Sequence, residues 1–263
     1  MYVYNLVLEV TRRCNMCCAH CMRGSAQRMD MSYSTLWNAL RDISSISTLI
    51  LTGGEPSLKP GIAMDVWRIM ISRKISLSDF YVVTNARSTY RRDEFLEALD
   101  HLYDWSDEKD MCALVVSQDQ YHNALRQPNM KGFYEVKDLY DEYGYEREYF
   151  KPSERKENII YTINEGRAAQ TGVGTKPMKL QKPWEVARWD GELHVQENEV
   201  YISANGNVTS CCDMSYQRID KEAIGNINHE PLEEIILRNC EWIDGDDEQM
   251  TGEPTSEPVK EEV

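Results

Sequence analysis

The chain has 263 residues, of which 29 are Lys or Arg and 44 are Asp or Glu, so its formal charge is −15. Apolar residues make up 41% of the chain, enough to fill a hydrophobic core, and this excludes a chain that is disordered throughout. General nucleic-acid binding is excluded as well, because it requires clustered Lys and Arg. Residues 244–263 hold eight carboxylates against Lys260, and so contribute −7 of the total charge.

The order of the predicted elements indicates an α/β fold. Apolar and β-branched runs predict strands at Tyr2–Val10, Thr48–Thr52, Phe80–Thr84 and Cys112–Val116. Helical periodicity and capping residues predict helices from Ser32 or Ser34 to about Ile43, at Pro60–Arg73 and at Arg91–Tyr103. Strands that alternate with helices of about 10–15 residues are typical of right-handed βαβ units, which build a parallel sheet.

The C-terminal part follows a different pattern. Asn205-Gly206 stands between two strand-like runs and predicts a hairpin with a type I′ turn, in which both central residues take positive φ. A hairpin after a series of βα units marks a change of architecture, so we place a domain boundary near Trp189. The predicted organisation is a core at 1–189, an extension at 190–243 and a disordered acidic tail at 244–263.

The sequence argues against a membrane protein or a secreted protein. No apolar run approaches the roughly 20 residues that a spanning helix requires. Met1–Val10 has no cationic segment before its apolar residues, unlike a signal peptide. Eight cysteines are too few and too bunched for a disulfide framework. Such bunching favours metal binding in a reducing compartment, and we expect a cytoplasmic protein.

Four cysteines, Cys14, Cys17, Cys18 and Cys21, follow the first predicted strand. They can be grouped as two abutting Cys-x2-Cys pairs, as in a zinc site, although zinc sites usually separate their pairs by a dozen or more residues. They can also be grouped as Cys14-x3-Cys18-x2-Cys21, with Cys17 outside the group. Three thiolates on one loop can hold three irons of a 4Fe–4S cluster and leave the fourth iron open.

The second grouping resembles the signature of the radical SAM (S-adenosylmethionine) superfamily. That signature has the same spacing and an aromatic-type residue before the last cysteine, where this chain has His20. Gly53-Gly54-Glu55-Pro56, after the second predicted strand, is similar to the family's motif that binds the amino group of SAM. Glycines allow close approach of a ligand to the backbone, and Glu55 offers a carboxylate to an ammonium group.

Two further strand ends carry weaker matches to the family. Thr84 and Asn85 resemble a polar pair that lies near the ribose of SAM. Ser117 and Asp119 resemble a Ser-x-Asp motif of peptide-modifying members. In those members the serine and a downstream arginine hold the carboxylate of the methionine part, and Arg126 is the nearest candidate in this chain.

The resemblance implies that a 4Fe–4S cluster is bound by Cys14, Cys18 and Cys21, and that SAM binds at the open iron. The stretch from Thr11 to Arg28 contains no carboxylate, and its cations are Arg12, Arg13, Arg23 and Arg28. We therefore expect positive charge around the proposed cluster.

The C-terminal pattern Gly206-x4-Cys211 resembles the extension called twitch or SPASM, which binds auxiliary iron–sulfur clusters and is common in enzymes that modify peptides. The family places a further cysteine upstream of the glycine, and residues 190–204 contain none. Cys211 and Cys212 are the candidate ligands, and we do not expect an auxiliary cluster. A hairpin and helix without a cluster would close the open edge of the partial barrel.

By this resemblance the core is a partial (β/α)6 TIM-type barrel with a small C-terminal α+β extension, and its active site lies at the carboxyl ends of the strands. The implied reaction is cleavage of SAM by an electron from a flavodoxin- or ferredoxin-type donor, after which the 5′-deoxyadenosyl radical takes a hydrogen atom from the substrate. We expect a peptide or protein substrate. The alternatives are a nucleotide or other small metabolite, and a non-catalytic iron–sulfur or zinc-binding protein.

Overall fold

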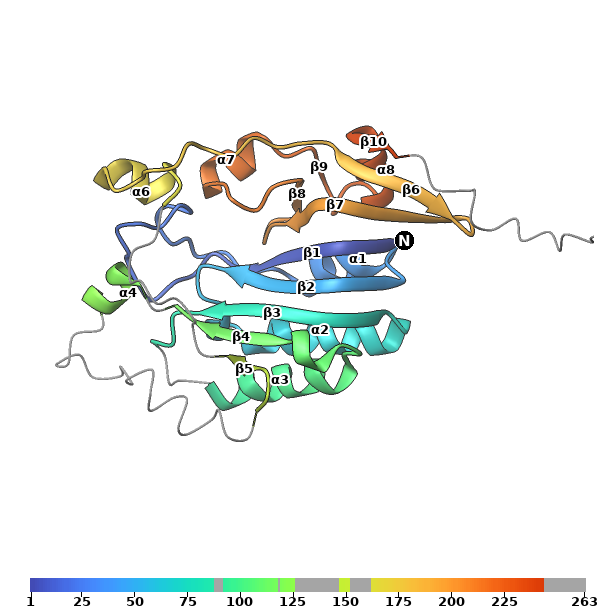
Figure 1. The fold of residues 1–263 in the computed structure, drawn as a ribbon, viewed down its shortest axis with the longest axis horizontal. Helices are drawn as coiled ribbons and strands as arrows, with labels where there is room; N and C mark the ends of the chain where they lie inside the picture. Colours follow the sequence, from blue (N-terminus) through green and yellow to red (C-terminus); the bar gives the residue numbers. More distant parts are fainter. Residues whose placement is uncertain (88–91, 118, 126–146, 152–161, 244–263) are drawn as a thin grey trace, which may run out of the picture.

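The computed structural model describes residues 1–87, 92–117, 119–125, 147–151 and 162–243 (Figure 1). Its strands are β1 (Tyr2–Thr11), β2 (Ser45–Gly53), β3 (Ser76–Thr84), β4 (Ala113–Val116), β5 (Phe150–Lys151), β6 (Trp184–Trp189), β7 (Glu192–Ile202), β8 (Asn207–Thr209), β9 (Gly225–Asn226) and β10 (Cys240–Trp242). Its α-helices are α1 (Tyr33–Leu40), α2 (Pro60–Arg73), α3 (Arg92–Trp105), α4 (Gln120–Leu125), α6 (Gly166–Thr171), α7 (Tyr216–Lys221) and α8 (Leu232–Arg238). Two 3-10 helices are η1 (Pro56–Leu58) and η2 (Lys109–Met111).

One sheet runs through the molecule in the order β10-β6-β7-β1-β2-β3-β4-β5. Strands β1 to β5 pair as parallel neighbours in chain order. On its other edge β1 pairs in parallel with β7, and β6 and β7 form an antiparallel hairpin. The C-terminal elements therefore lie along β1, at the end of the sheet opposite to β5 (Figure 1). This mixed α/β architecture with its parallel sheet confirms the predicted fold class.

The predicted elements of the first half differ from the structure mainly at their ends. Helix α2 covers the predicted residues, with Pro60 in its first turn and Lys74 in the left-handed conformation after its last turn. Strands β2 and β3 begin earlier than predicted, at Ser45 and Ser76, whose hydroxyl groups bond to each other at 2.8 Å. These polar residues extend the strands at the sheet edge, where the apolar pattern gives no signal.

The type I′ turn predicted at Asn205-Gly206 is wrong in kind. Strands β7 and β8 do form the hairpin, but Gly206 has a positive φ (88°) and Asn205 does not. The N–H of Gly206 donates to the carbonyl of Ser203 at 2.8 Å, which is the geometry of a longer loop with one left-handed residue. Two successive positive φ values occur instead at Asp190 (51°) and Gly191 (79°), between β6 and β7. This Asp-Gly pair carries the same signal.

The predicted domain boundaries stay a prediction. Trp189 is the last residue of β6, and residues 244–263 lie outside the described part of the chain. Among the described helices, none combines the length and apolar character that crossing a membrane would require.

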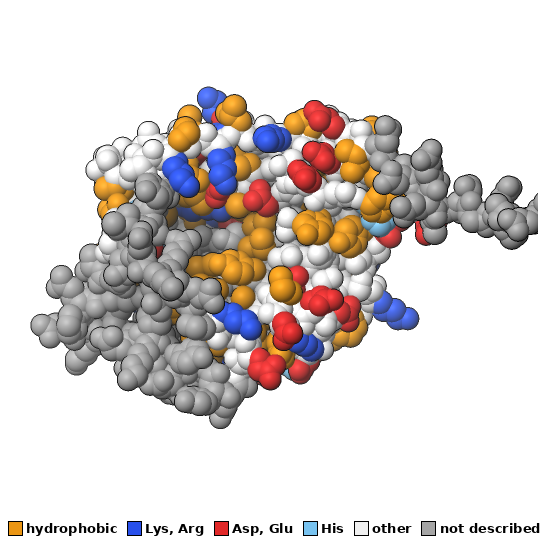
Figure 2. Space-filling view, viewed as in Figure 1, with side chains coloured by type: hydrophobic (Ala, Val, Ile, Leu, Met, Phe, Trp, Pro, Cys, Tyr) orange, Lys and Arg blue, Asp and Glu red, His pale blue; other side chains and the backbone are white. Residues whose placement is uncertain are grey.

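The two faces of the sheet have different neighbours. Leu8 of β1 and Val82 of β3 belong to the main core, which includes residues of α1, α2 and α3. Side chains alternate along a strand, so Val7 of β1 faces the other way and packs with residues of the C-terminal elements. Farther along this second face Tyr81 and Val83 of β3 are exposed. Figure 2 shows apolar side chains gathered between the C-terminal elements and strands β3 and β4.

Candidate active site

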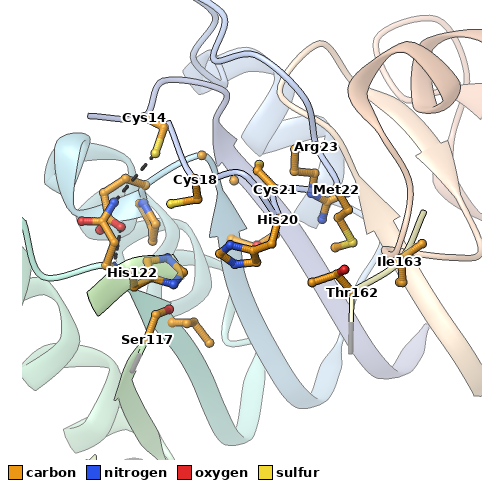
Figure 3. A pocket seen from close by; sticks show the side chains of 17 residues that line it. Cys14, Cys18, His20, Cys21, Met22, Arg23, Ser117, His122, Thr162 and Ile163 are labelled. Atoms are coloured by element: carbon orange, nitrogen blue, oxygen red, sulfur yellow. Dashed lines mark hydrogen bonds between the residues drawn. The ribbon is translucent and has the colours of Figure 1, made fainter. Parts of the chain in front are cut away.

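The candidate active site is a cavity of about 350 Å³ at the carboxyl ends of β1 to β4 (Figure 3). This volume lies in the range of small-ligand pockets. The sequence-predicted residues in its wall are Cys14, Cys18, His20, Cys21, Gly53, Gly54, Glu55, Pro56, Asn85 and Ser117. Thr84 and Asp119 are outside the wall but bond to residues within it. Arg126 lies outside the described residues.

Three of the four bunched cysteines line the cavity together. Cys14, Cys18 and Cys21 are in its wall, whereas Cys17 is exposed and is not part of it. Burial, with the neighbouring thiols, raises the pKa of Cys14 to about 11 and the pKa of Cys18 to about 12. Thiols with such pKa values stay protonated at neutral pH unless a cation ionises them, and iron is such a cation. The arrangement favours the grouping that leaves Cys17 outside.

Residues 12–29 form the cysteine loop, which leaves the sheet after β1 and is closed by backbone bonds at its base. The N–H of Arg12 donates to the carbonyl of Met29, and the N–H of Gln27 donates to the carbonyl of Arg12, both at 2.9 Å. Next to this base the hydroxyl of Thr11 donates to the Asp30 carboxylate at 2.7 Å. The loop is therefore anchored at both ends beside β1.

The positive charge expected around the cysteines is largely neutralised by carboxylates. Arg12 is buried and bonds through Nε to Glu9 at 2.6 Å and through both terminal nitrogens to Asp220 at 2.8 Å. Arg13 pairs with Asp30 at 3.0 Å. The expectation is wrong for these two arginines, because their partners come from β1 and from segments beyond the cysteine loop.

Gly53 and Gly54 lie against the cysteine loop. Gly53 has a φ of 146°, and a Cβ atom on it would lie 2.0 Å from the carbonyl oxygen of Thr11. The N–H of Gly54 donates to that same oxygen at 2.8 Å, and a Cβ atom on Gly54 would lie 2.2 Å from the carbonyl oxygen of Arg13. Glycine is required at both positions because two backbones of the chain meet here.

Glu55 is a buried carboxylate that accepts four hydrogen bonds from its own chain. Its Oε1 accepts from the N–H of Ser57 at 3.2 Å and from the hydroxyls of Ser57 and Thr84 at 2.5 and 2.7 Å. Its Oε2 accepts from the N–H of Asn85 at 2.8 Å. Glu55 therefore ties the end of β2 to the end of β3. Its contact with the ammonium of SAM stays a prediction.

Asn85 and Ser117 bring the ends of β3 and β4 to the cysteine loop. The amide nitrogen of Asn85 donates to Oδ1 of Asn15 at 3.0 Å and lies 3.8 Å from Sγ of Cys14. The N–H of Ser117 donates to the carbonyl of Thr84 at 2.9 Å. Both side chains are thus held beside the cysteines by backbone pairing of neighbouring strands.

A cluster of aromatic and acidic side chains covers Cys18. Nδ1 of His122 lies 2.6 Å from Oδ2 of Asp119, and Oδ1 of Asp119 accepts from the N–H groups of Tyr121 and His122 at 2.9 and 3.0 Å. Burial acts to raise the pKa of Asp119, but these bonds lower it to about 2. The His20 ring stacks on Tyr121 at 4.6 Å and meets His122 edge-on at 4.9 Å.

His20 has an unsatisfied atom in this cluster. Its Nδ1 is buried and has no hydrogen-bond partner in the described part of the chain. The ligating atoms of Cys18, His20 and His122 lie within 4.8 Å of one another. A buried polar nitrogen normally finds a partner, so a ligand at this position would satisfy it.

The other wall of the cavity contains Met22, Arg23, Thr162 and Ile163 (Figure 3). Sequence analysis did not assign these residues to the site. Met22 and Arg23 could have been found because they follow Cys21 directly. Thr162 and Ile163 come from a segment far along the chain, and no local pattern marks them.

The C-terminal elements hold the cysteine loop from the second face of the sheet. Glu9 is fully buried and accepts from Arg12, from the hydroxyl of Tyr201 and from the N–H of Ala204. Asp220 of α7 binds Arg12. Sequence analysis missed this network, although a carboxylate in the middle of the apolar strand β1 is a signal that could have revealed Glu9.

The remaining candidate ligands lie apart from the cavity. Cys211 is buried in the second-face cluster, and Sγ of Cys212 lies 3.5 Å from Oε1 of Glu199. Cys240 lies on β10, which pairs with β6 at the sheet edge. Within the described ranges, no group of three metal-binding side chains includes any of these cysteines. Whether the extension holds an auxiliary cluster therefore stays a matter of prediction.

Comparison with solved structures gives two radical SAM proteins. The crystal structure of BtrN in complex with AdoMet and 2-DOIA has a TM-score of 0.47 and 19% identity, and the match covers 89% of this chain and 81% of that one. Streptococcus suis SuiB bound to precursor peptide SuiA has a TM-score of 0.44 and 12% identity, and the match covers 89% of this chain and 64% of SuiB. No curated protein matches the chain.

Two family models match the chain. The model of the SPASM iron–sulfur cluster-binding domain matches residues 194–250, which suggests additional clusters in the extension. The model of the radical SAM superfamily matches residues 8–162, more than half of the chain, and implies a 4Fe–4S cluster and SAM as cofactors. The chain therefore belongs to the radical SAM superfamily and carries a SPASM-type C-terminal domain.

Proposed function

We propose that this protein is an enzyme that cleaves SAM at a 4Fe–4S cluster and abstracts a hydrogen atom from a peptide or protein substrate. The observation that carries the proposal is that Cys14, Cys18 and Cys21 line one cavity with residues 53–56, Asn85 and Ser117. When bound, the cluster supplies an electron from a flavodoxin- or ferredoxin-type donor to SAM, and the resulting 5′-deoxyadenosyl radical takes the hydrogen atom.

The residues present fit these cofactors. Three close thiols with no fourth cysteine in the wall suit a cluster with one open iron. The partnerless Nδ1 of His20 needs a polar ligand atom. The hydrogen bonds of Glu55 hold the ends of β2 and β3 in fixed positions, so that the loops around the ligand are ordered before it binds.

The chain's own residues position the ligands and exclude water. The buried faces of Cys18 and Pro56 close the cavity toward the protein interior. Such enclosure protects a reactive intermediate from solvent. The His20–Tyr121 stack gives the wall a flat aromatic surface, against which a planar ring can pack.

A peptide substrate is supported by the SPASM-type domain and by the second face of the sheet. The extension resembles those found in enzymes that modify peptides. Tyr81 and Val83 are exposed on the strand that ends at Thr84, beside the cavity. An apolar strip of this kind suits the side chains of an extended peptide better than it suits a charged metabolite.

The experiment is anaerobic reconstitution followed by measurement of bound iron and of 5′-deoxyadenosine formed from SAM with dithionite. We expect about four irons per chain, loss of iron and product in Cys14→Ala, and retention of both in Cys17→Ser. Stoichiometric zinc in place of iron, or an intact cluster in Cys14→Ala, would overturn the cluster assignment. Iron without 5′-deoxyadenosine would leave a non-catalytic iron–sulfur protein.

The substrate class is tested separately, with the same holoenzyme. Peptides and nucleotides are added with SAM and dithionite, and mass spectrometry follows both the additive and the 5′-deoxyadenosine. We expect a mass change in peptides only. Conversion of a nucleotide in place of the peptides would contradict the proposed substrate.

A further inference from the structure

Arg23 is a buried cation in the wall of the cavity. It follows Cys21 by two residues, and its side chain is 8% exposed. It is the one Lys or Arg among the described residues that line the cavity. In Figure 3 its side chain lies beside Met22, on the side of the cavity away from Cys14 and His122.

The contacts of Arg23 leave its positive charge without a carboxylate partner. Nη1 donates to the carbonyl of Met214 at 2.9 Å, and the guanidinium lies over the ring of Tyr201 at 5.0 Å. Over the described ranges, no carboxylate oxygen lies within 4.0 Å of it. Glu9 is the carboxylate that acts on Arg23 electrostatically, but its oxygens accept from Arg12 and from two other donors.

Arg12 provides a comparison within the same molecule. It is equally buried, yet it contacts two carboxylates, Glu9 and Asp220. A buried charge that serves structure alone is normally paired in this way, because removal from water without an opposite charge is costly. Arg23 lacks such pairing and faces a cavity, which is the arrangement of a group that receives an anion from outside.

The position of Arg23 points to the substrate as the source of that anion. The residues predicted to bind SAM, namely residues 53–56, Asn85 and Ser117, come from the ends of β2, β3 and β4. Arg23 shares the other wall with Thr162 and Ile163, which no cofactor prediction involves. The stacking of its guanidinium on Tyr201 leaves the edge of the plane for a planar, singly charged group, and a carboxylate has that shape.

We propose that Arg23 binds a carboxylate of the peptide substrate beside the reacting centre, which makes it a specificity-determining residue. The inference rests on the proposed function and adds the substrate class, a peptide with an acidic residue or a free C-terminus at the reacting position. A phosphate dianion would call for more than one cation, and Arg23 is the single one in the described wall.

The test is ligand-observed NMR titration of the oxidised, SAM-loaded holoenzyme with three blocked tripeptides. Acetyl-Gly-Glu-Gly-amide carries a side-chain carboxylate, acetyl-Gly-Gln-Gly-amide is its neutral isostere, and acetyl-Gly-Gln-Gly with a free C-terminus moves the carboxylate. We expect one carboxylate peptide to bind about tenfold more tightly than the neutral one, as a charge-assisted bond in a buried site allows. Equal affinities for all three would overturn the proposal without any variant.

Variants then locate the effect. Arg23→Gln should remove the preference while iron content and SAM affinity stay as in the wild type, and Arg23→Lys should keep part of it. The matched control is Arg167→Gln, which removes a cation beside the cysteine loop from a residue that is not in the cavity wall. A preference that survives in Arg23→Gln would overturn the assignment of the site to this residue, as would its loss in Arg167→Gln.

Failure of the inference and failure of the proposed function are distinguishable. Formation of 5′-deoxyadenosine without peptide is measured on the same preparation. If it is absent, the enzymatic function fails. If it is present but AMP binds more tightly than every peptide, the anion site is retained and the peptide is rejected as its ligand.

Discussion

Asp220 and Arg12, 208 positions apart in the chain, form a two-point ion pair with both N···O distances at 2.8 Å. Arg12 lies at the base of the cysteine loop, and Asp220 lies on α7 of the C-terminal domain. The same arginine bonds to Glu9 of β1. The position of the cysteines is therefore set jointly by the first strand and by the SPASM-type domain, so that the two parts of the molecule cannot be judged separately.

Asp220→Asn should lower the free energy of unfolding by about 1.5 kcal/mol, because Arg12 stays buried after it loses one of its two charged partners. The partial exposure of Asp220 keeps the effect below the about 3–5 kcal/mol typical of breaking a fully buried pair. Urea unfolding of the apoprotein measures it. Glu222→Gln, which removes an exposed carboxylate just after the same helix, is the control and should change stability by less than about 0.5 kcal/mol. Equal effects of the two substitutions would show that the ion pair contributes nothing special.

The contribution of Asp220 should also depend on pH in one direction. Burial acts to raise its pKa, but the bonds from Arg12 outweigh this and hold the pKa below its ordinary value of 3.8. A carboxyl whose pKa is lowered by folding stabilises the folded state above the unfolded pKa, and this stabilisation is lost as the pH falls through the folded pKa. The difference between wild type and Asp220→Asn should thus be constant from about pH 7 to about pH 5 and shrink below about pH 4. Urea midpoints across this range give the answer, and a difference that grows on acidification would contradict it.

Gly53→Ala should destabilise the protein by about 3 kcal/mol and reduce bound iron, because the new Cβ atom would overlap the Thr11 carbonyl oxygen in a strained conformation. The distance of 2.0 Å to a backbone oxygen cannot be relieved by a side-chain rotation. Gly61→Ala, in the first turn of α2, is the matched control, since no atom lies within 4 Å of its added Cβ. Unfolding midpoints and iron content are compared. Similar results for both variants would mean that the backbone contact at Gly53 relaxes freely.

The double variant Cys211→Ser/Cys212→Ser should keep the full iron content of the reconstituted wild type. The reason is that, in the described part of the chain, neither thiol has two further ligating groups close to it. Iron is counted per chain, with Cys14→Ala as the variant that must lose it. A fall of about half in the double variant would reveal an auxiliary cluster, as the SPASM match suggests.

Much of the site was predictable from sequence, because its residues stand directly after strands. Strands β1 to β4 are parallel neighbours, so their carboxyl ends meet, and local patterns are enough to bring Cys14, residues 53–56, Asn85 and Ser117 to one place. The partners of these residues were not predictable. The hydrogen bonds that Glu55 accepts from Thr84 and Asn85 depend on the register between β2 and β3.

The C-terminal half was harder to predict for a physical reason. The parallel pairing of β7 with β1 joins segments almost a full chain apart, and no local pattern specifies such a contact. Arg12 was consequently interpreted as a free positive charge, whereas it is paired with Asp220. The two hairpin signals, Asn205-Gly206 and Asp190-Gly191, are locally alike, and the number of residues between the paired strands decides which one forms the two-residue turn.

The pairing of β1 with β7 also has a consequence for biosynthesis. β1 and the cysteine loop leave the ribosome first, but β7 and Asp220 are made only near the end of translation. Contacts between such distant segments form slowly. The nascent chain therefore exposes four closely spaced thiols before the loop can be locked, and iron delivery and protection from oxidation must operate on a late folding intermediate or on the completed chain.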